Sequence, residues 1–506
     1  MMDDSSSQEM PKQSTFNGMR YLFTLMGFFG YFTVYAVRVN INVAIVAMVN
    51  STAVYHPSES SSGECKVDTP SFLSNDSAYD PPADGEFVWS PNMQGVILGA
   101  FYYGYCITQI PGGRLSEMYS AKWVYGIGTF ITALLTLVTP LAARWHVGAL
   151  IFIRAMEGLA QGVTMPAMYS LMGRWLPDCE KGLLSAIIYC GINMGTVVTM
   201  PLAGLLCRSD FMGGWPSAFY VVGIFGCVWF VAWCLLVTDS PVNHPYITAK
   251  ELKYITSNQK IEQNVELPPI PWLKILKSVP FWGLLITQIG NDWAFYTIVN
   301  DLPTFFGTIL HIQVEKNGFL SSFPYLLQTA VGTLVAYVTD KMMRKGLTTT
   351  NFVRKFCNTV SSVGTAAGLI GVCLAGCDVR LHVAFFTSSL ALGGFCTCGY
   401  MLSHLDLSPE YAGTLMGIAN TVSNLSGFLA PQVVGSLTEE SQTLHQWHIV
   451  FAISIVMMLT TSVVFIAFVT TEKQPWATQE PQYTVLEQTE PLQIQHKYGT
   501  MDKGDV

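Results

Sequence analysis

The chain has 506 residues, of which 50% are hydrophobic and only 12% are charged, and its formal net charge is −8 at pH 7. A soluble globular chain carries about 25% charged residues, so this composition excludes such a protein and predicts a chain that lies mostly in lipid. Its twelve cysteines form no CxxC pair, which argues against a structural zinc site or another metal centre.

The predicted elements begin with a polar stretch, residues 1–18, which we expect to be a cytoplasmic tail because it lacks the basic segment and cleavage site of a signal peptide. An apolar span is predicted at 19–50, and a polar, acidic loop follows at 51–90. Two N-glycosylation sequons begin at Asn50 and Asn75. Because such sites are modified only on the lumenal or extracellular side, we expect both asparagines to carry glycans and the loop to face that side.

Further apolar stretches follow, each with about the 20 residues that a bilayer crossing requires. They are predicted at 91–117, 123–143, 147–172, 182–206, 216–238, 280–310, 317–340, 353–376, 381–403, 410–437 and 447–471. A charged segment interrupts the series after the sixth span, and the last span is followed by a polar tail. We therefore predict an all-α membrane protein with twelve transmembrane helices in two six-helix bundles, 19–238 and 280–471, joined by a cytoplasmic linker at 239–279 and ending in a cytoplasmic tail at 472–506.

The distribution of lysine and arginine predicts the orientation of these spans. With the N-terminus inside, nineteen of the 26 basic residues fall in inner segments and five in outer segments. Only Arg38 and Arg154 lie within spans. The positive-inside rule therefore places both termini in the cytoplasm.

A short pattern recurs after the second and eighth spans. Small residues, then an acid, then bases occur in 112–122 around Glu117 and again in 336–345 around Asp340. Small residues let two helices approach closely, and an acid at such a place can cap the N-terminus of a neighbouring helix. The alternative is a pair of ordinary positive-inside loops, which the matched positions disfavour.

Ionisable residues inside spans are the first candidates for a functional site, because a charge at mid-membrane depth costs roughly 3 to over 10 kcal/mol without partners or water. In the fourth span, Arg154, Glu157 and Gln161 share one helical face. Arg154 is either a substrate-facing cation, able to bind a carboxylate or phosphate through two parallel hydrogen bonds, or half of a structural ion pair with Glu157. Arg38, one turn after Tyr35, lies too deep in its span for snorkelling.

Four stretches of the chain carry a family resemblance. They are Tyr35–Asn40, Phe101–Gly113, Arg154–Ala167 and Asn317–Tyr325. Together with the twelve spans and the repeated loop they resemble the anion:cation symporter family of the major facilitator superfamily, which contains sialin, the vesicular glutamate transporters and the sodium-phosphate cotransporters. The resemblance implies two bundles around a central site that opens alternately to each side, and an anionic substrate.

The resemblance also implies roles for individual residues. Arg38 and Arg154 fall on the arginines that serve substrate recognition and coupling, and Glu157 matches an acid of sialin. The resemblance further implies that Tyr35, Tyr103 and Tyr296 match residues that line a sialin-like cavity.

The chain departs from the family pattern at two places. Gln161 stands where sialin and the glutamate transporters have a second acid implicated in proton coupling, as in the phosphate-cotransporter branch. Asn291 stands in place of the seventh-span arginine of the glutamate transporters, which disfavours vesicular glutamate loading. We predict that Asn291 itself contributes to substrate binding. We predict that the adjacent Asp292, an acid in an otherwise apolar span, replaces the missing carboxylate in proton or sodium coupling. The alternative is a hydrogen-bonded acid without a transport role.

Glu157 is the other predicted coupling residue, because a substrate that competes for Arg154 frees this carboxylate to take a proton. The alternative is a permanent salt bridge. His404 and Asp406 lie at the cytoplasmic end of the predicted tenth span. For them we predict a loop salt bridge or gate contact rather than direct binding of a transported ligand. Tyr483 begins a YTVL motif that fits a sorting signal, which predicts a sorting adaptor as a partner.

We therefore interpret the chain as a secondary active symporter that moves a small organic anion, a sialic acid-like acidic sugar or an acidic amino acid, together with H⁺. The alternatives are a Na⁺-dependent cotransporter of phosphate or another anion, which Gln161 favours, and a non-transporting membrane receptor or scaffold. No enzyme activity, nucleic-acid partner or cofactor is expected, apart from the co-transported H⁺ or Na⁺. The expected location is the plasma membrane or a lysosomal or endosomal membrane.

Overall fold

The computed structural model describes residues 18–50, 85–257, 270–309, 314–438 and 443–477. Within these ranges the elements are helices, apart from an isolated bridge between Val49 and Phe87. In chain order they are α1 (Met19–Met48), α3 (Pro91–Leu115), η1 (Ser116–Ser120), α4 (Ala121–Trp145), α5 (Val147–Gly162), α6 (Thr164–Trp175), α7 (Lys181–Arg208), η2 (Phe211–Gly213), α8 (Pro216–Leu236), η3 (Pro241–Asn243), α9 (Ala249–Ser257), α10 (Trp272–Leu276), α11 (Val279–Thr308), α12 (Val314–Arg344), α13 (Thr350–Leu374), α14 (Val379–Gly393), η4 (Gly394–Thr397), α15 (Tyr400–Leu407), α16 (Ala412–Ser423), α17 (Leu425–Thr438) and α18 (Leu444–Phe468).

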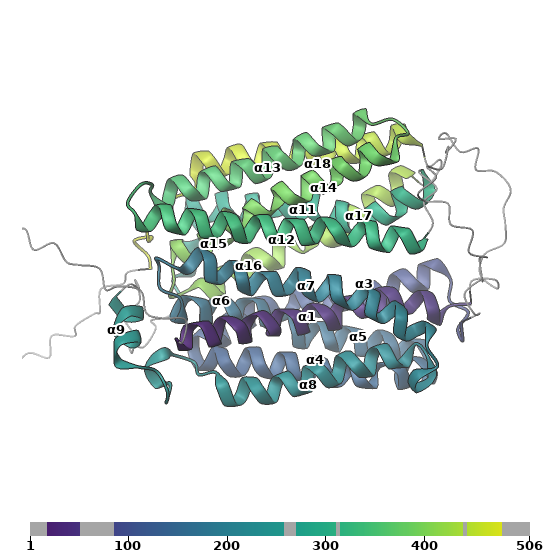
Figure 1. The fold of residues 1–506 in the computed structure, drawn as a ribbon, viewed down its shortest axis with the longest axis horizontal. Coiled ribbons are helices and arrows are strands. Elements are labelled where there is room, and N and C mark those ends of the chain that lie inside the picture. The colour runs from purple at the N-terminus through teal and green to yellow at the C-terminus, as the bar shows by residue number, and fades with distance from the viewer. Residues whose placement is uncertain (1–17, 51–84, 258–269, 310–313, 439–442, 478–506) are drawn as a thin grey trace, which may run out of the picture.

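The long helices form two groups that run along the same axis (Figure 1). In the N-terminal group α1 packs on α7 and α8, α3 on α5, and α4 on α5 and α8. In the C-terminal group α13 packs on α14 and α18, and α11 on α17 and α18. The two groups meet where α7 contacts α12 and where α16 contacts α3 and α6, and these contacts define the seam between the bundles.

Eight stretches of the described chain are long and apolar enough to cross a membrane. One of them, Met93–Trp145, contains both α3 and α4 because the helical backbone continues through η1. Helices α11 and α12 and the pair α16–α17 occupy the other expected positions, and for these the assignment as spans stays a prediction.

Three of the predicted spans are each divided into shorter helices. The fourth is α5 and α6, the tenth is α14, η4 and α15, and the eleventh is α16 and α17. At the eleventh, the Asn424 amide donates to the Asn420 carbonyl at 2.6 Å, and a side chain bonded in this way competes with the regular helical ladder. The breaks leave polar side chains and backbone groups inside otherwise apolar segments.

Glycine contacts set the spacing of α3 and α5. A Cβ atom built on Gly104 would lie 2.1 Å from the Ala155 carbonyl oxygen, and one built on Gly158 would lie 1.9 Å from the Phe101 carbonyl oxygen. Both contacts are with backbone that cannot rotate away. This close approach, typical of small-residue helix packing in membranes, holds Arg154 of α5 beside the aromatic residues of α3.

Gly158→Val is therefore expected to prevent the two helices from packing, because overpacking a close contact costs about 1–3 kcal/mol even where side chains can adjust, and here backbone is the neighbour. The measurement is the yield of monodisperse protein by size-exclusion chromatography in detergent. The matched control is Gly99→Val on α3, where a Cβ atom would meet nothing within 4 Å. Equal yields of the two variants would contradict the prediction.

The two repeated acids cap helices of the opposite bundle, which confirms the capping role predicted for them. Glu117 accepts hydrogen bonds from the backbone N–H of Thr414 at 2.6 Å and from its hydroxyl at 2.5 Å, at the start of α16. Asp340 of α12 accepts the backbone N–H of Leu183 at 2.7 Å, at the start of α7. Both contacts cross the seam at the end where α9 lies (Figure 1), so they hold this end closed.

Glu117→Gln is expected to shift the conformational balance toward opening of this end, because hydrogen bonds to a charged group contribute about 1.5–3 kcal/mol. Distances between genetically encoded spin labels at the exposed positions 119 and 347, one in each bundle, would report the shift. Glu86→Gln is the control, because Glu86 pairs with Arg144 at the opposite end of α4, and it should leave the distance distribution unchanged. An unchanged distribution in both variants would show that the cap does not hold the bundles together.

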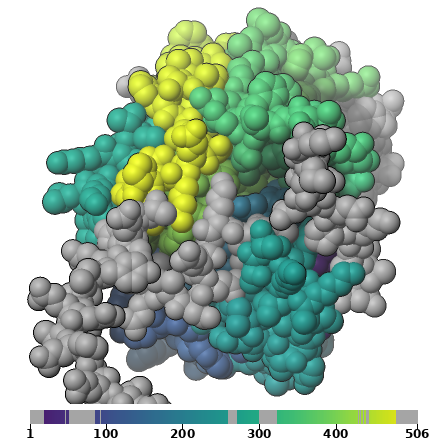
Figure 2. All heavy atoms as spheres, turned by 90° about the vertical axis from the view of Figure 1, so that its left-hand side faces the viewer, coloured from purple at the N-terminus to yellow at the C-terminus, as the bar shows by residue number. Residues whose placement is uncertain are grey.

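The linker helix α9 covers the start of α1. The Glu251 carboxylate accepts the backbone N–H groups of Met19 at 2.9 Å and Arg20 at 3.1 Å, so it caps that helix. The buried Arg20 side chain also pairs with Glu180 at 2.9 Å. Figure 2, viewed from this end, shows linker residues in teal beside a patch of purple from α1.

The opposite end of the helices has contacts of its own. The Asn50 N–H donates to the Phe87 carbonyl at 2.8 Å, while most of the predicted loop, Asn75 included, lies outside the described residues. Arg144 pairs with Glu86 at 3.0 Å. Its hydrogen bonds lower the pKa of the Glu86 carboxyl below the ordinary value, so this pair is lost only when the pH falls through that lowered value. Cys377, after α13, is disulfide-bonded.

Candidate functional site

Arg38 lies at the centre of an aromatic shell. Its guanidinium carbon lies 4.9–5.5 Å from the centroids of four rings, those of Tyr35, Phe101, Tyr102 and Tyr105. In the part of the chain that the structure describes, no carboxylate lies within ion-pair distance of Arg38. Rings attract the cation through their π faces, but they carry no net negative charge that would neutralise it. Arg38 is therefore a cation available to an anion.

Arg154, unlike Arg38, is paired with a carboxylate. It is 3% exposed, and its Nη1 lies 2.5 Å from Glu157 Oε2. The other carboxylate oxygen of Glu157 accepts hydrogen bonds from Thr136 at 3.1 Å and Thr139 at 3.2 Å. In this conformation the structural ion pair is therefore formed. Arg154 also lies 5.2 Å from the Phe101 ring, so the two intramembrane arginines share one aromatic contact.

Gln161 holds α5 against α1. Its side chain is fully buried, and its amide donates to the backbone carbonyl of Val34 at 2.7 Å. That carbonyl belongs to the helical turn that precedes Arg38. Gln161 therefore positions the helix that presents Arg38, while its predicted part in ion coupling remains untested.

Asp292 lies on a polar face of α11. Gln288, Asp292 and Tyr296 are spaced by four residues and share this face. The Tyr400 hydroxyl of α15 donates to Asp292 Oδ1 at 3.5 Å, and the Tyr296 hydroxyl donates to Asn424 Oδ1 at 2.9 Å. Among the described residues no cation lies within ion-pair distance of Asp292. The site thus contains one unpaired cation and one unpaired carboxylate, in opposite bundles.

A chain of polar contacts connects these two residues across the seam. Tyr105, which contacts Arg38, accepts a hydrogen bond from Asn420 of α16 at 3.4 Å. Gln288, one turn before Asp292, donates to Asn420 at 3.5 Å and to Ser423 at 3.0 Å. Sequence reasoning missed this connection. The signal was present in the run of polar residues at 420–424 within an otherwise apolar span.

Of the other predicted substrate residues, Tyr103 lies on an exposed face of its helix and Asn291 is bonded within its own helix. The Tyr103 side chain is 59% exposed, on the face of α3 that also presents Val96 and Ile107, and its neighbours Tyr102 and Tyr105 contact Arg38 instead. The Asn291 amide donates to the Thr287 carbonyl of its own helix at 2.9 Å. Adjacent residues of a helix point about 100° apart. Which of two neighbouring residues faces the site therefore depends on helix packing, which the composition does not reveal.

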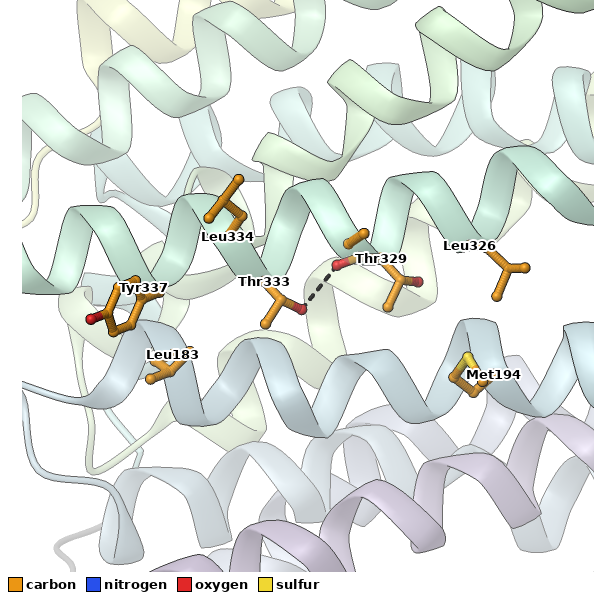
Figure 3. Close-up of a pocket in the computed structure, with 8 residues that line it drawn as sticks. Leu183, Met194, Leu326, Thr329, Thr333, Leu334 and Tyr337 are labelled. Carbon is orange, nitrogen blue, oxygen red and sulfur yellow. Dashed lines mark hydrogen bonds between the residues drawn. The ribbon is translucent and has the colours of Figure 1, made fainter.

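A groove of about 580 Å³ runs along the α7–α12 contact (Figure 3). Apolar residues, among them Met194 and Leu326, line most of it. Its Thr329 hydroxyl already accepts the Asn193 amide at 2.8 Å, and Thr333 donates to the Thr329 carbonyl at 2.9 Å. No charged side chain lines this groove in the described part of the chain, so it does not fit the predicted anion.

Near the end of α15, Asp406 forms an ion pair with Arg354 of α13 at 2.7 Å, which confirms the salt bridge predicted for it. His404, two residues earlier, is buried without a hydrogen-bond partner among the described residues. The YTVL motif at Tyr483 lies outside the described residues.

Comparison with known proteins places this arrangement in a family. The Major Facilitator Superfamily model matches residues 27–431. The chain is 38% identical to sialin of Ovis aries over 464 residues, which are 92% of each chain. It is 37% identical to a putative inorganic phosphate cotransporter of Drosophila melanogaster over 90% of this chain and 86% of that one. It is 33% identical to the human vesicular glutamate transporter 2 over 91% and 76% of the two chains.

Among solved structures, the proton:xylose symporter XylE has the same fold, with a TM-score of 0.68 at 13% identity over 90% of this chain and 97% of that one. The expected fold and family resemblance are thereby confirmed. Because the relatives are transporters of this superfamily, the chain is a multi-pass membrane transporter and not an enzyme. It belongs to the major facilitator superfamily, in the anion:cation symporter group with sialin, the phosphate cotransporters and the vesicular glutamate transporters.

Proposed function

We propose that this transporter is a symporter that moves a small organic anion together with H⁺ by alternating access. The observation that carries the proposal is the unpaired Arg38 guanidinium in its aromatic shell. An unneutralised charge at this depth is costly, and a bound carboxylate offsets that cost through two charge-assisted hydrogen bonds. An intramembrane cation that has no acid partner among the described residues therefore favours transport over a receptor or scaffold.

Charge balance between the bundles supports coupling to a proton. Arg154 and Glu157 neutralise each other, so the remaining charges of the site are those of Arg38 and Asp292. When the anion neutralises Arg38, a proton on Asp292 restores an uncharged site, and each ligand makes the binding of the other more favourable. Separate binding of the proton or the anion would leave a net charge in a medium of low dielectric constant.

The proposed substrate class is an acidic sugar like sialic acid, or an acidic amino acid. Sialin is among the most similar relatives, at 38% identity. The rings around Arg38 also suit a substrate that combines a carboxylate with a weakly polar ring face. The vesicular glutamate transporters are more distant, at 33%, and Asn291 occupies the place of their seventh-span arginine.

A second candidate is a Na⁺-dependent cotransporter of phosphate or another anion. Gln161 favours it, because this position resembles the phosphate-cotransporter branch, and a putative inorganic phosphate cotransporter is 37% identical to the chain. Against it, the Gln161 amide is bonded to the backbone of α1, so it already has a packing role.

We also propose that both termini are cytoplasmic and that the protein lies in a lysosomal, endosomal or plasma membrane. The disulfide at Cys377 supports this orientation, because disulfides persist in oxidising compartments, and the loop after α13 is an outer loop in the proposed topology. Glycans at Asn50 and Asn75 and an adaptor contact at Tyr483 belong to the same proposal. Removal of N-glycans by a glycosidase, read as a mobility shift lost in Asn50→Gln or Asn75→Gln, tests the orientation.

The test of the function is uptake of labelled sialic acid into proteoliposomes under an imposed proton gradient without sodium, with Arg154→Ala as a control. Uptake that follows the gradient and is lost in the variant supports proton-coupled transport of a carboxylate. No uptake until sodium and phosphate are supplied would favour the second candidate.

A further inference from the structure

His404 of α15 is a buried titratable residue that the proposed function leaves unused. Its side chain is 0% exposed, and neither ring nitrogen has a hydrogen-bond partner in the described chain. The backbone carbonyl of Met401, which is close to the imidazole, accepts the Tyr169 hydroxyl at 3.3 Å. Buried polar groups are almost always hydrogen-bonded, so two unpartnered nitrogens on one imidazole require an explanation.

The position of His404 relates it to the proposed coupling site. It lies one turn after Tyr400, whose hydroxyl donates to Asp292 at 3.5 Å. Residues four apart on a helix share a face, and α15 ends at Leu407, next to the cytoplasmic loop in the proposed topology. His404 therefore lies between Asp292 and the cytoplasmic end of the seam.

The residue is covered from the opposite bundle. The ring of Tyr169, from α6, lies 6.2 Å from the imidazole at an interplanar angle of 82°. Tyr189 of α7 lies 6.1 Å from Tyr169, and Tyr31 of α1 stacks on Tyr189 at 6.0 Å. The caps formed by Glu117 and Asp340 close the same end. A rocking motion that separates the bundles here would expose the imidazole to cytoplasmic water.

The charged and titratable surroundings leave the imidazole free to change its protonation. The group that faces it from α6 is Tyr169, with Tyr189 of α7 and Tyr31 of α1 behind that ring. From η4 the Cys396 thiol donates to Met401 of α15, and the α16 residues in the same cluster, Ala412 and Met416, are apolar. On its own helix Asp406 is occupied by Arg354 of α13. From α11 the acid that approaches, through Tyr400, is Asp292.

We propose that His404 binds the transported proton after Asp292 and releases it to the cytoplasmic side, an inference that rests on the proposed proton symport. The proton leaves the Asp292 carboxyl through the Tyr400 hydroxyl, which accepts one proton and gives up its own to an imidazole nitrogen. The new N–H bond breaks when cytoplasmic water takes the proton. His404 is thus a coupling residue and not a substrate ligand.

The test compares two assays of the reconstituted full chain with labelled sialic acid. His404→Asn is expected to lower proton-driven uptake by about 5–150-fold, the usual range of a coupling free energy, while counterflow against unlabelled sialic acid falls far less because exchange needs no net proton release. His382→Asn is the matched control, since this histidine is also buried in the C-terminal bundle but contacts the Asp378 carbonyl at 2.9 Å. It should leave both assays near wild type.

Wild-type driven uptake in His404→Asn, or equal loss of both assays in monodisperse protein, would overturn the proposal. A second measurement, on the unmutated chain, tests the proposal even if the variant misfolds or sialic acid is not the substrate. The pH dependence of deuterium exchange at the imidazole C2 carbon, read by mass spectrometry, reports protonation of individual histidines. Titration of His404 supports the proposal even if sialic acid is not transported, whereas an exchange rate that does not change between pH 5 and pH 8 refutes it.

Discussion

Arg38→Gln is expected to abolish uptake of the anion while the protein still folds. Removing one partner of a buried charge pair costs about 2–5 kcal/mol, which corresponds to a loss of about 30-fold to several thousand-fold in affinity. The reason is that Arg38 has aromatic contacts but no acid neighbour in the described chain, so its loss leaves no uncompensated carboxylate in the free protein. The measurement is the concentration dependence of labelled sialic acid uptake in proteoliposomes.

Arg38→Lys separates charge from geometry, since lysine keeps the cation but loses the planar pair of donors, and it should retain part of the activity. Arg144→Gln is the matched control. Arg144 forms a half-exposed ion pair with Glu86, which contributes about 0.2–1 kcal/mol, so uptake should change little. Unimpaired uptake by Arg38→Gln would remove the observation on which the proposed function rests.

Asp292→Asn is expected to uncouple transport from the proton gradient. The amide keeps the size of the side chain and its contact with Tyr400, but it cannot take up a proton. Gradient-driven uptake should therefore fall by about 5–150-fold, while counterflow of labelled against unlabelled sialic acid persists. Both are measured in the same proteoliposomes over a series of external pH values and with sodium present or absent.

Glu157→Gln discriminates between the two acids of the site. Glu157 is held by Arg154 and by two threonine hydroxyls, so its loss strands a buried arginine, and both driven uptake and counterflow should fall together. A pH and sodium dependence that Asp292→Asn leaves unchanged would assign Asp292 a packing role, and loss of driven uptake alone in Glu157→Gln would transfer the coupling role to Glu157.

Several features of the site followed from the chain alone. Arg154 and Glu157 were predicted to share one helical face because helical periodicity puts positions three apart on the same side, and the structure brings them to 2.5 Å. The capping role of the repeated acids was predicted in the same way, from small residues, an acid and bases at matched positions. Both inferences depend on spacing within a short segment, which is local information.

The contacts between segments far apart in the chain were decided by the tertiary structure. Three tyrosines lie in the run Tyr102–Tyr105, and the sequence does not show which of them contact Arg38. The close packing of Gly104 and Gly158 turns Tyr102 and Tyr105 toward Arg38 and leaves the Tyr103 side chain exposed on the surface of α3.

By itself, then, the sequence determined that this is a helical membrane transporter with an arginine-based site, because hydrophobic length, charge distribution and helical period are properties of each segment. Only the tertiary structure decided that Arg154 is paired while Arg38 is open, that Gln161 bonds to α1, and that His404 lies beneath Tyr169 of the other bundle. The physical reason is that burial and hydrogen-bond partners depend on which faces of distant helices meet at the seam, and no single segment encodes that.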